Sequence, residues 1–268
     1  MTTLDLQLNL TEKGILVVKR TDNLEAYDYL LRGLEFSFNV TKEANVQARQ
    51  MFEKAIALDP KYSDAYAWLG NVLLEDQVSQ WNPHGLDLAV QLEQQSIDLD
   101  NSNALAYAMM SFALNQKRQH DLSIRAAERA IALDTNSAPG YTALALALSD
   151  SGRPAEALVA VHKADRLDPQ DQGSNAVIEG RTYFLLGRYE EAIPPLKKHL
   201  ARGNAIPVHL FLTACYVELG RNKEARAEAT EVMRINPQFS LAAAKQMATM
   251  KESLRDRLFA DYAKAGLK

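Results

Sequence analysis

Apolar residues recur along the chain at a spacing that predicts helices. In Tyr66-Leu69-Leu73 and Tyr141-Leu144-Leu148 they share one face of an α-helix, and they do not alternate as in a strand. Short polar stretches, such as 150–154 and 186–189, separate these segments. Glycine in such a stretch permits the positive φ that ends a helix, and proline suits the first turn of the next helix. The pattern predicts an all-α protein of paired helices joined by short turns.

The helix pairs resemble one another at an interval of about 34 residues. The first helix of a pair carries an aromatic residue and then a small one, as in Tyr29 and Gly33. The second carries a small residue such as Ala48 and ends at a turn like Asp59-Pro60, where proline stops the helix. Similarity at a fixed interval is typical of stacked repeats, whose function lies along a surface rather than in a cluster of catalytic groups.

Small residues mark the points where the two helices of a pair are expected to cross closely. We expect glycines to face alanines there, with larger side chains in the grooves beside them: Gly33 with Ala48, Gly70 with Ala89 and Gly180 with Ala192, beside Phe52, Leu196 and Tyr29.

This pattern resembles the tetratricopeptide repeat (TPR), for example in Tyr66-Leu69-Gly70-Leu73 and in Ala157, Val161, Ala164 and Pro169. Glu93 and His199 depart from the repeat, because they replace the expected phenylalanine and alanine. The resemblance covers about residues 26–237 and implies a right-handed α-solenoid of six TPR units with C-terminal capping helices. The domains expected from it are an N-terminal segment at 1–22, six repeats at 23–237 and capping helices at 238–268.

Three segments carry a narrower resemblance: 21–33, the loop with Trp81-Asn82-Pro83, and the tail 261–267. They look like the TPR region behind the catalytic domain of many bacterial class III adenylate/guanylate cyclases. In those proteins the region is a regulatory or interaction module. The cyclase domain itself would require an α/β pattern with paired metal-binding aspartates, which this chain does not show. The resemblance therefore implies the module and not the enzyme.

Composition excludes some classes of partner. The formal net charge is −4 and no run of Lys or Arg exceeds two residues, so nucleic-acid binding is disfavoured. No stretch reaches the ~18 apolar residues of a membrane helix, and the N-terminus does not resemble a signal peptide. We expect a cytoplasmic protein that binds no membrane.

The sequence gives only weak indications of a catalytic or metal-binding site. The single Cys215 lies in an apolar stretch and is expected to be a buried structural thiol. The five histidines show no metal-ligand spacing, most are expected on the surface, and no phosphate-binding glycine loop or nucleophile motif occurs. We expect no metal and no cofactor.

We expect helices at both ends of the repeat array. Residues 238–265 predict one or two helices that cap the last repeat, with Lys251, Glu252, Arg255, Asp256 and Arg257 on their solvated face. At the other end, Thr11-Glu12 could cap a short helix through Lys19.

In TPR proteins the first helices line a concave groove, and the corresponding positions here are apolar with sparse amides and one arginine. Such a groove suits an extended peptide or a partner helix. The candidate partner-binding residues are Phe38, Asn71, Glu75, Phe112, Asn115, Gln116, Arg181 and Phe184. An alternative is that Phe184, Leu185 and Leu210 simply pack between repeats. The residues with which chaperone-binding TPR domains clamp a C-terminal carboxylate are absent except for Asn71, so that partner is disfavoured.

The sequence favours a non-catalytic scaffold that binds a protein or peptide in its groove. The alternative is a sensor module that controls an attached or associated effector such as a nucleotide cyclase. The insertion around Trp81 either anchors a partner or folds back over neighbouring helix ends. Homodimerisation through this insertion or the terminal helices stays open.

Overall fold

The computed structural model describes residues 2–12, 18–39, 41–78, 85–169, 174–201 and 205–268. These residues form helices and no strand, as the apolar spacing predicts. The helices are α1 (Thr3–Glu12), α2 (Leu24–Ser37), α3 (Lys42–Leu58), α4 (Ser63–Val78), α5 (Leu86–Leu99), α6 (Ala104–Gln116), α7 (His120–Leu133), α8 (Ala138–Asp150), α9 (Pro154–Leu167), α10 (Ser174–Leu185), α11 (Tyr189–Leu200), α12 (Ile206–Glu218), α13 (Asn222–Ile235), α14 (Leu241–Met247) and α15 (Glu252–Lys264).

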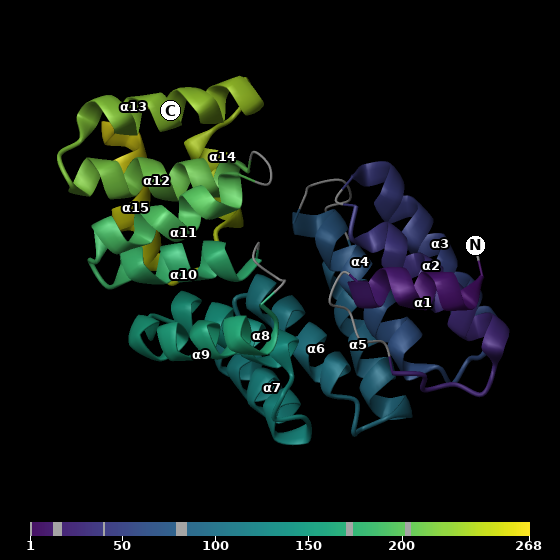
Figure 1. Cartoon of the computed structure of the whole chain (residues 1–268). Coiled ribbons are helices and arrows are strands. Elements are labelled where there is room, and N and C mark those ends of the chain that lie inside the picture. Colours follow the sequence, from purple (N-terminus) through teal and green to yellow (C-terminus); the bar gives the residue numbers. More distant parts are fainter. Residues whose placement is uncertain (1, 13–17, 40, 79–84, 170–173, 202–204) are drawn as a thin grey trace. The chain divides into compact units, whose positions relative to one another are not determined.

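The chain divides into two compact units, Met1–Ala143 and Leu144–Lys268, here called unit 1 and unit 2. In unit 1 the helices pack as the pairs α2/α3, α4/α5 and α6/α7, and α1 lies against α2 (Figure 1). In unit 2 the pairs α10/α11 and α12/α13 follow α9, and α14 and α15 end the chain. Phe52 and Tyr62 lie in the core of unit 1, and Leu196 and Leu212 in that of unit 2.

Helix ends between pairs depend on an aspartate or asparagine side chain. α3, α5, α7 and α13 each end one residue before Asp59, Asp100, Asp134 or Asn236. In all four turns the Oδ1 atom accepts a hydrogen bond from the backbone N–H two residues later, at 2.9–3.0 Å. Because the turns after Asp100 and Asp134 lack proline, the carboxylate directs this turn, and proline only reinforces it.

Turns within the later pairs use a left-handed residue. Gly152, Gly187 and Gly220 have φ values of 83°, 75° and 71°, and Arg118 occupies the equivalent place with φ 58°. Each of these glycines is followed by an arginine whose guanidinium pairs with a glutamate three residues later: Arg153–Glu156, Arg188–Glu191 and Arg221–Glu224. The predicted turn glycines and the first-turn position of Pro154 are thus confirmed.

Helix crossings differ from expectation in one respect. A Cβ atom at Gly33 would lie 2.4 Å from Cε1 of Phe52, and one at Gly180 would lie 2.5 Å from Cγ of Leu196. The glycines therefore make room for the large side chain four residues beyond the alanine, not chiefly for the alanine itself. Residues four apart share one helix face, so the larger one reaches over the crossing point.

The N-terminal end also differs from expectation. The N-terminal helix covers Thr3–Glu12, and residues 18–20 are not helical, so Thr11 lies within a helix rather than at the start of one. At the other end, two helices form within the predicted stretch, and α15 packs against α12 of the last pair. The division into an N-terminal segment, six repeats and a capping region stays a prediction.

Candidate functional site

Four of the predicted groove residues lie on two neighbouring helices of unit 1. The first helices of its pairs form a row, here called the unit 1 row, in which α2 contacts α4 and α4 contacts α6. Asn71 and Glu75 on α4, and Phe112 and Gln116 on α6, are all partly exposed. Phe112 packs against a small apolar cluster that includes Leu74. Neighbouring helices of the row thus carry three partly exposed polar side chains and one partly exposed aromatic ring.

The other two predicted residues of unit 1 lie differently. Phe38 follows the last residue of α2 and is 44% exposed. Asn115 is buried, and its Oδ1 atom lies 3.1 Å from Nδ1 of His120 at the start of α7. The Asn115 side chain therefore faces the turn between α6 and α7, and its binding role stays a prediction.

Arg181 and Phe184 lie on α10 in unit 2, where both side chains are buried. The Phe184 ring packs against Phe211 and Tyr189, with centroids 6.2 and 5.5 Å apart. The guanidinium of Arg257, on α15, lies 5.6 Å from the centre of the same ring. Phe184 thus packs between neighbouring helix pairs, as the alternative reading expected, and is also covered by the chain's own last helix.

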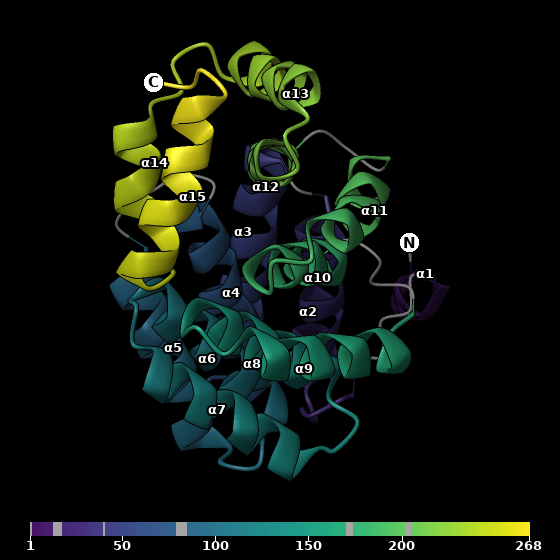
Figure 2. The ribbon, with the colours of Figure 1, turned by 90° about the vertical axis from the view of Figure 1, so that its left-hand side faces the viewer.

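The C-terminal helix lies along the first helices of unit 2. Figure 2 shows α15, in yellow, on one side of α12, with α11 on the other side. Within α15, Leu258, Phe259, Asp261 and Tyr262 are buried and Leu254 is half-buried, so the helix has one buried, mainly apolar face, as an amphipathic helix does. The face formed by α10 and α12 on this side, here called the unit 2 face, is therefore occupied by a segment of the same chain.

The residues just before α15, Thr249 and Lys251, are hydrogen-bonded to Asp150 at the end of α8. Oδ2 of Asp150 accepts a hydrogen bond of 2.6 Å from the Thr249 hydroxyl, and its backbone carbonyl accepts one of 3.0 Å from the Lys251 N–H. The Asp150 carboxylate also forms an ion pair with the guanidinium of Arg181. Burial lowers the pKa of Arg181 to about 10, which leaves it charged at neutral pH. Asp150 therefore joins the segment to the predicted groove arginine.

The middle of α15 brings acidic groups together. Asp261 is buried, and burial, together with the nearby Glu218 of α12, raises the pKa of its carboxyl, while Lys264 lowers it. Tyr262 is also buried there, and burial raises the pKa of its phenol well above the ordinary value. Burial raises the pKa of the Cys215 thiol to about 12, so Cys215 is a structural thiol, as expected.

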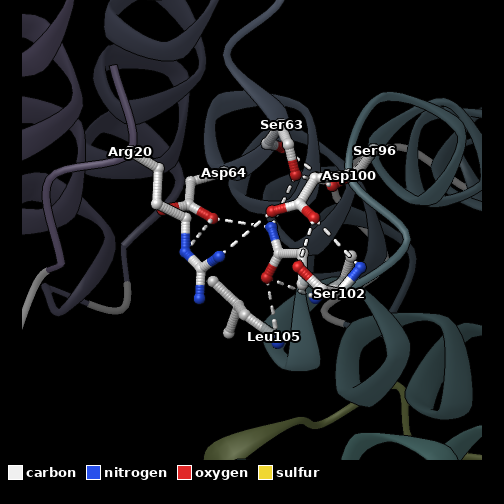
Figure 3. Close-up of polar contacts among 9 residues, drawn as sticks. Arg20, Ser63, Asp64, Ser96, Asp100, Ser102 and Leu105 are labelled. Carbon is white, nitrogen blue, oxygen red and sulfur yellow. Dashed lines mark hydrogen bonds and ion pairs between the residues drawn. The ribbon is translucent and has the colours of Figure 1, made fainter. Parts of the chain in front are cut away.

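A second polar cluster holds the segment before α2 against two turns of unit 1 (Figure 3). The Arg20 guanidinium lies 3.0 Å from Asp100 and 3.7 Å from Asp64. Asn103 caps α6 and donates hydrogen bonds of 2.6 Å to Ser63 and Asp64. Burial raises the pKa of Asp64 to about 6, against the opposing effects of Arg20 and Asn103. The cluster joins residues that are 80 positions apart in the sequence.

The described residues also bear on metal binding, cavities and membrane-spanning helices. They contain no group of three His, Cys, Asp or Glu that could hold a metal. A cavity of about 240 Å³ is lined by Asp165, Pro169, Ala176, Glu179 and Lys198. None of the helices within these residues has the length and apolarity needed to cross a membrane. The insertion around Trp81 lies outside the described residues.

Two of the histidines make contacts between helices. His209 is buried, and its Nδ1 atom lies 2.6 Å from a Glu228 oxygen between α12 and α13. His162, whose side chain is 39% exposed, makes a similar contact of 3.1 Å with Glu179 between α9 and α10. His209 is thus an exception to the expectation that most histidines lie on the surface.

The fold and the repeated turns agree with comparisons to known proteins. The sequence model of the tetratricopeptide repeat matches residues 51–81. A thermophilic TPR protein of Thermus thermophilus is 19% identical, with 73% of this chain and 98% of that chain covered and a TM-score of 0.54. The APC/C hetero-tetramer Cut9-Hcn1 is 16% identical, with 97% of this chain and 46% of that chain covered and a TM-score of 0.67. The chain thus contains a match to the tetratricopeptide repeat at residues 51–81 and shares the fold of these solved structures.

One curated relative matches part of the TPR chain. It is "Putative adenylate cyclase 3" of Rhizobium meliloti (strain 1021), 36% identical over 100 residues. The match covers 36% of the TPR chain and 17% of the relative's length.

Two structural features of the chain were not predicted from the sequence. The C-terminal segment was expected to be a cap, and the amphipathic stripe at Leu258 and Tyr262 gave its helical form but not the surface against which it packs. Arg20 matches no position of the repeat pattern, and only its place just before α2 could have drawn attention to it.

Proposed function

We propose that the TPR chain is a non-catalytic protein-interaction module whose unit 1 row binds a peptide segment of a partner protein. The observation that carries this proposal lies in unit 2, where the equivalent face of α10 and α12 buries an amphipathic helix. A TPR face in this chain thus has the shape and chemistry to hold a peptide segment.

The unit 1 row offers suitable contacts. Asn71 and Gln116 carry amides that can pair with peptide backbone groups, and the Phe112 ring provides an apolar contact. All three are partly exposed. Helices that are already packed lose little freedom on binding, so the partner segment bears most of the ordering cost.

Site-specific photo-crosslinking in cells tests this proposal. A photoreactive side chain at Gln116 should give a discrete adduct with one protein, and Asn71→Ala in the same chain should reduce its yield several-fold. The matched control carries the photoreactive group at the exposed Glu128 of α7. Equal adducts from both positions, or a yield that Asn71→Ala does not change, would contradict binding at the row.

A second candidate function is regulation of a nucleotide cyclase, and the similarity to the Rhizobium relative favours it. Purified TPR chain added to that relative should change the rate of cyclic AMP formation from ATP. A chain with Asn71→Ala and Gln116→Ala serves as control. An unchanged rate at saturating chain would count against an effector of this class.

A further inference from the structure

We propose that α15 is a resident ligand of the unit 2 face, and that a partner helix with the same anchors displaces it. The anchors are an arginine directly followed by a leucine, with a tyrosine four residues after the leucine, as in Arg257, Leu258 and Tyr262. This proposal goes beyond binding at the unit 1 row and does not depend on it.

The first support is the position of the segment. Arg257 covers the Phe184 ring and also lies 3.6 Å from a Glu218 oxygen of α12. Leu258 and Tyr262 are 1% and 2% exposed, so both side chains are buried against the face. These contacts are those of a helix laid in a groove by anchors one turn apart.

The second support is the connection that leads into α15. The preceding α14 has only seven residues, and none of its side chains is buried. At the start of α15 no side chain caps the helix, since Lys251 occupies that place. The linker at 248–251 is held by Asp150 through Thr249 and the Lys251 N–H, and by the buried Met250. The contacts that must break for α15 to leave are therefore mainly those of its own buried side chains with the unit 2 core.

The third support is that buried polar atoms lack hydrogen-bond partners where α15 packs on the unit 2 face. Asp261 is buried opposite Glu218; its Oδ1 atom accepts a hydrogen bond from Lys264, whereas its Oδ2 atom has no hydrogen-bond partner. The buried Nε atom of Arg181 also has none. Groups of this kind reduce the stability of an interface because each loses its water without replacement. A partner helix with a neutral residue in place of Asp261 removes one of these penalties.

The chemistry of the displacing partner follows from the face. It is an amphipathic helix whose arginine stacks on Phe184 and pairs with Glu218, and whose leucine and tyrosine fill the buried positions. The carboxylate of Glu218 and the ring of Phe184 select the arginine, since a lysine stacks less well on an aromatic face.

Peptide binding by fluorescence anisotropy tests the proposal, with a labelled synthetic peptide of residues 248–268 as the probe. In one chain, Leu258→Ala and Tyr262→Ala weaken the resident helix and leave the face intact. This variant should bind the probe at least tenfold more tightly than the unchanged chain does. Adding Phe184→Ala should abolish the gain. A probe with Asp261→Asn should bind more tightly than the unaltered probe.

A second probe separates the anchors from the rest of the segment. An alanine-rich helix that carries only the arginine, leucine and tyrosine at the spacing of 257, 258 and 262 should compete with the first probe. The same helix with the tyrosine changed to alanine is its control. Failure of the anchored helix to compete would overturn the stated partner chemistry.

If the double variant remains helical by circular dichroism and binds the probe no better than the unchanged chain, α15 is a permanent part of the core and the proposal is wrong. If the double variant does not fold, hydrogen exchange of the unchanged chain decides. Faster exchange of α15 amides than of α12 amides supports a displaceable helix, and equal exchange contradicts it. Neither result depends on crosslinking at Gln116, so the two proposals can fail separately.

Discussion

At the scale of single residues, Glu93 shows how a departure from the repeat pattern becomes a measurable property. It stands where Phe52 and Leu196 stand in other pairs, and its side chain is buried against Gly70. Burial raises the pKa of its carboxyl well above the ordinary 4.5. The folded state therefore retains a proton that the unfolded state releases, so Glu93 destabilises the fold increasingly as pH rises above about 4.5.

Glu93→Gln should remove this dependence, because the amide has similar size and no charge. The advantage of the variant in unfolding free energy should be small near pH 4 and grow by up to about 1.4 kcal/mol per pH unit above it. Urea unfolding between pH 4 and 8 measures it. Glu128→Gln, on the exposed face of α7, is the control. A constant difference between Glu93→Gln and the unchanged chain across this range would show that the carboxyl is not protonated in the fold.

The left-handed turn residues provide a second prediction at this scale. Gly220 has φ 71°, and a Cβ there would meet nothing within 4 Å, so Gly220→Ala changes only the backbone energy. It should destabilise the chain by about 1–2 kcal/mol. Gly220→Asn should lose less, because asparagine tolerates this conformation. Thermal unfolding compares the two, and an equal loss in both would point to a side-chain effect instead.

At the scale of helices, the sequence predicted the parts that depend on local rules. The boundaries at Asp150, Pro154, Leu185 and Tyr189 follow from glycine and proline, whose backbone preferences act within a few residues. The placement of α15 against α12 could not be predicted, because an amphipathic stripe specifies an apolar partner but not which one. The burial of Asn115 was missed for a related reason, since its contact with His120 depends on the exact turn.

The close crossing of α10 and α11 allows a prediction about how tightly two helices of a pair must pack. Ala192 is buried in α11, and its carbonyl oxygen would lie 3.1 Å from a Cβ atom at Gly180. Ala192→Leu should overpack the α10/α11 crossing and cost about 1–3 kcal/mol. Ala227→Leu, at an exposed position of α13, should have an effect within about 0.5 kcal/mol. Chemical unfolding measures both, and similar effects would mean that α10 and α11 can separate without loss.

At the scale of the whole molecule, stacked repeats predict that damage remains local. In such arrays each repeat contacts its neighbours, and stability is approximately a sum of repeat and interface contributions. Gly33→Leu places a side chain where Phe52 already lies, 2.4 Å from the new Cβ, and should loosen α2 and α3 first. Hydrogen exchange should then rise strongly in α2 and α3, less in α4, and little in α12 and α15. Gly180→Leu should reverse this order, because its added atoms meet Leu196 in unit 2. Uniform loss of protection in either variant would show that the chain unfolds as one cooperative body, and α15 could then leave its face only when everything else does.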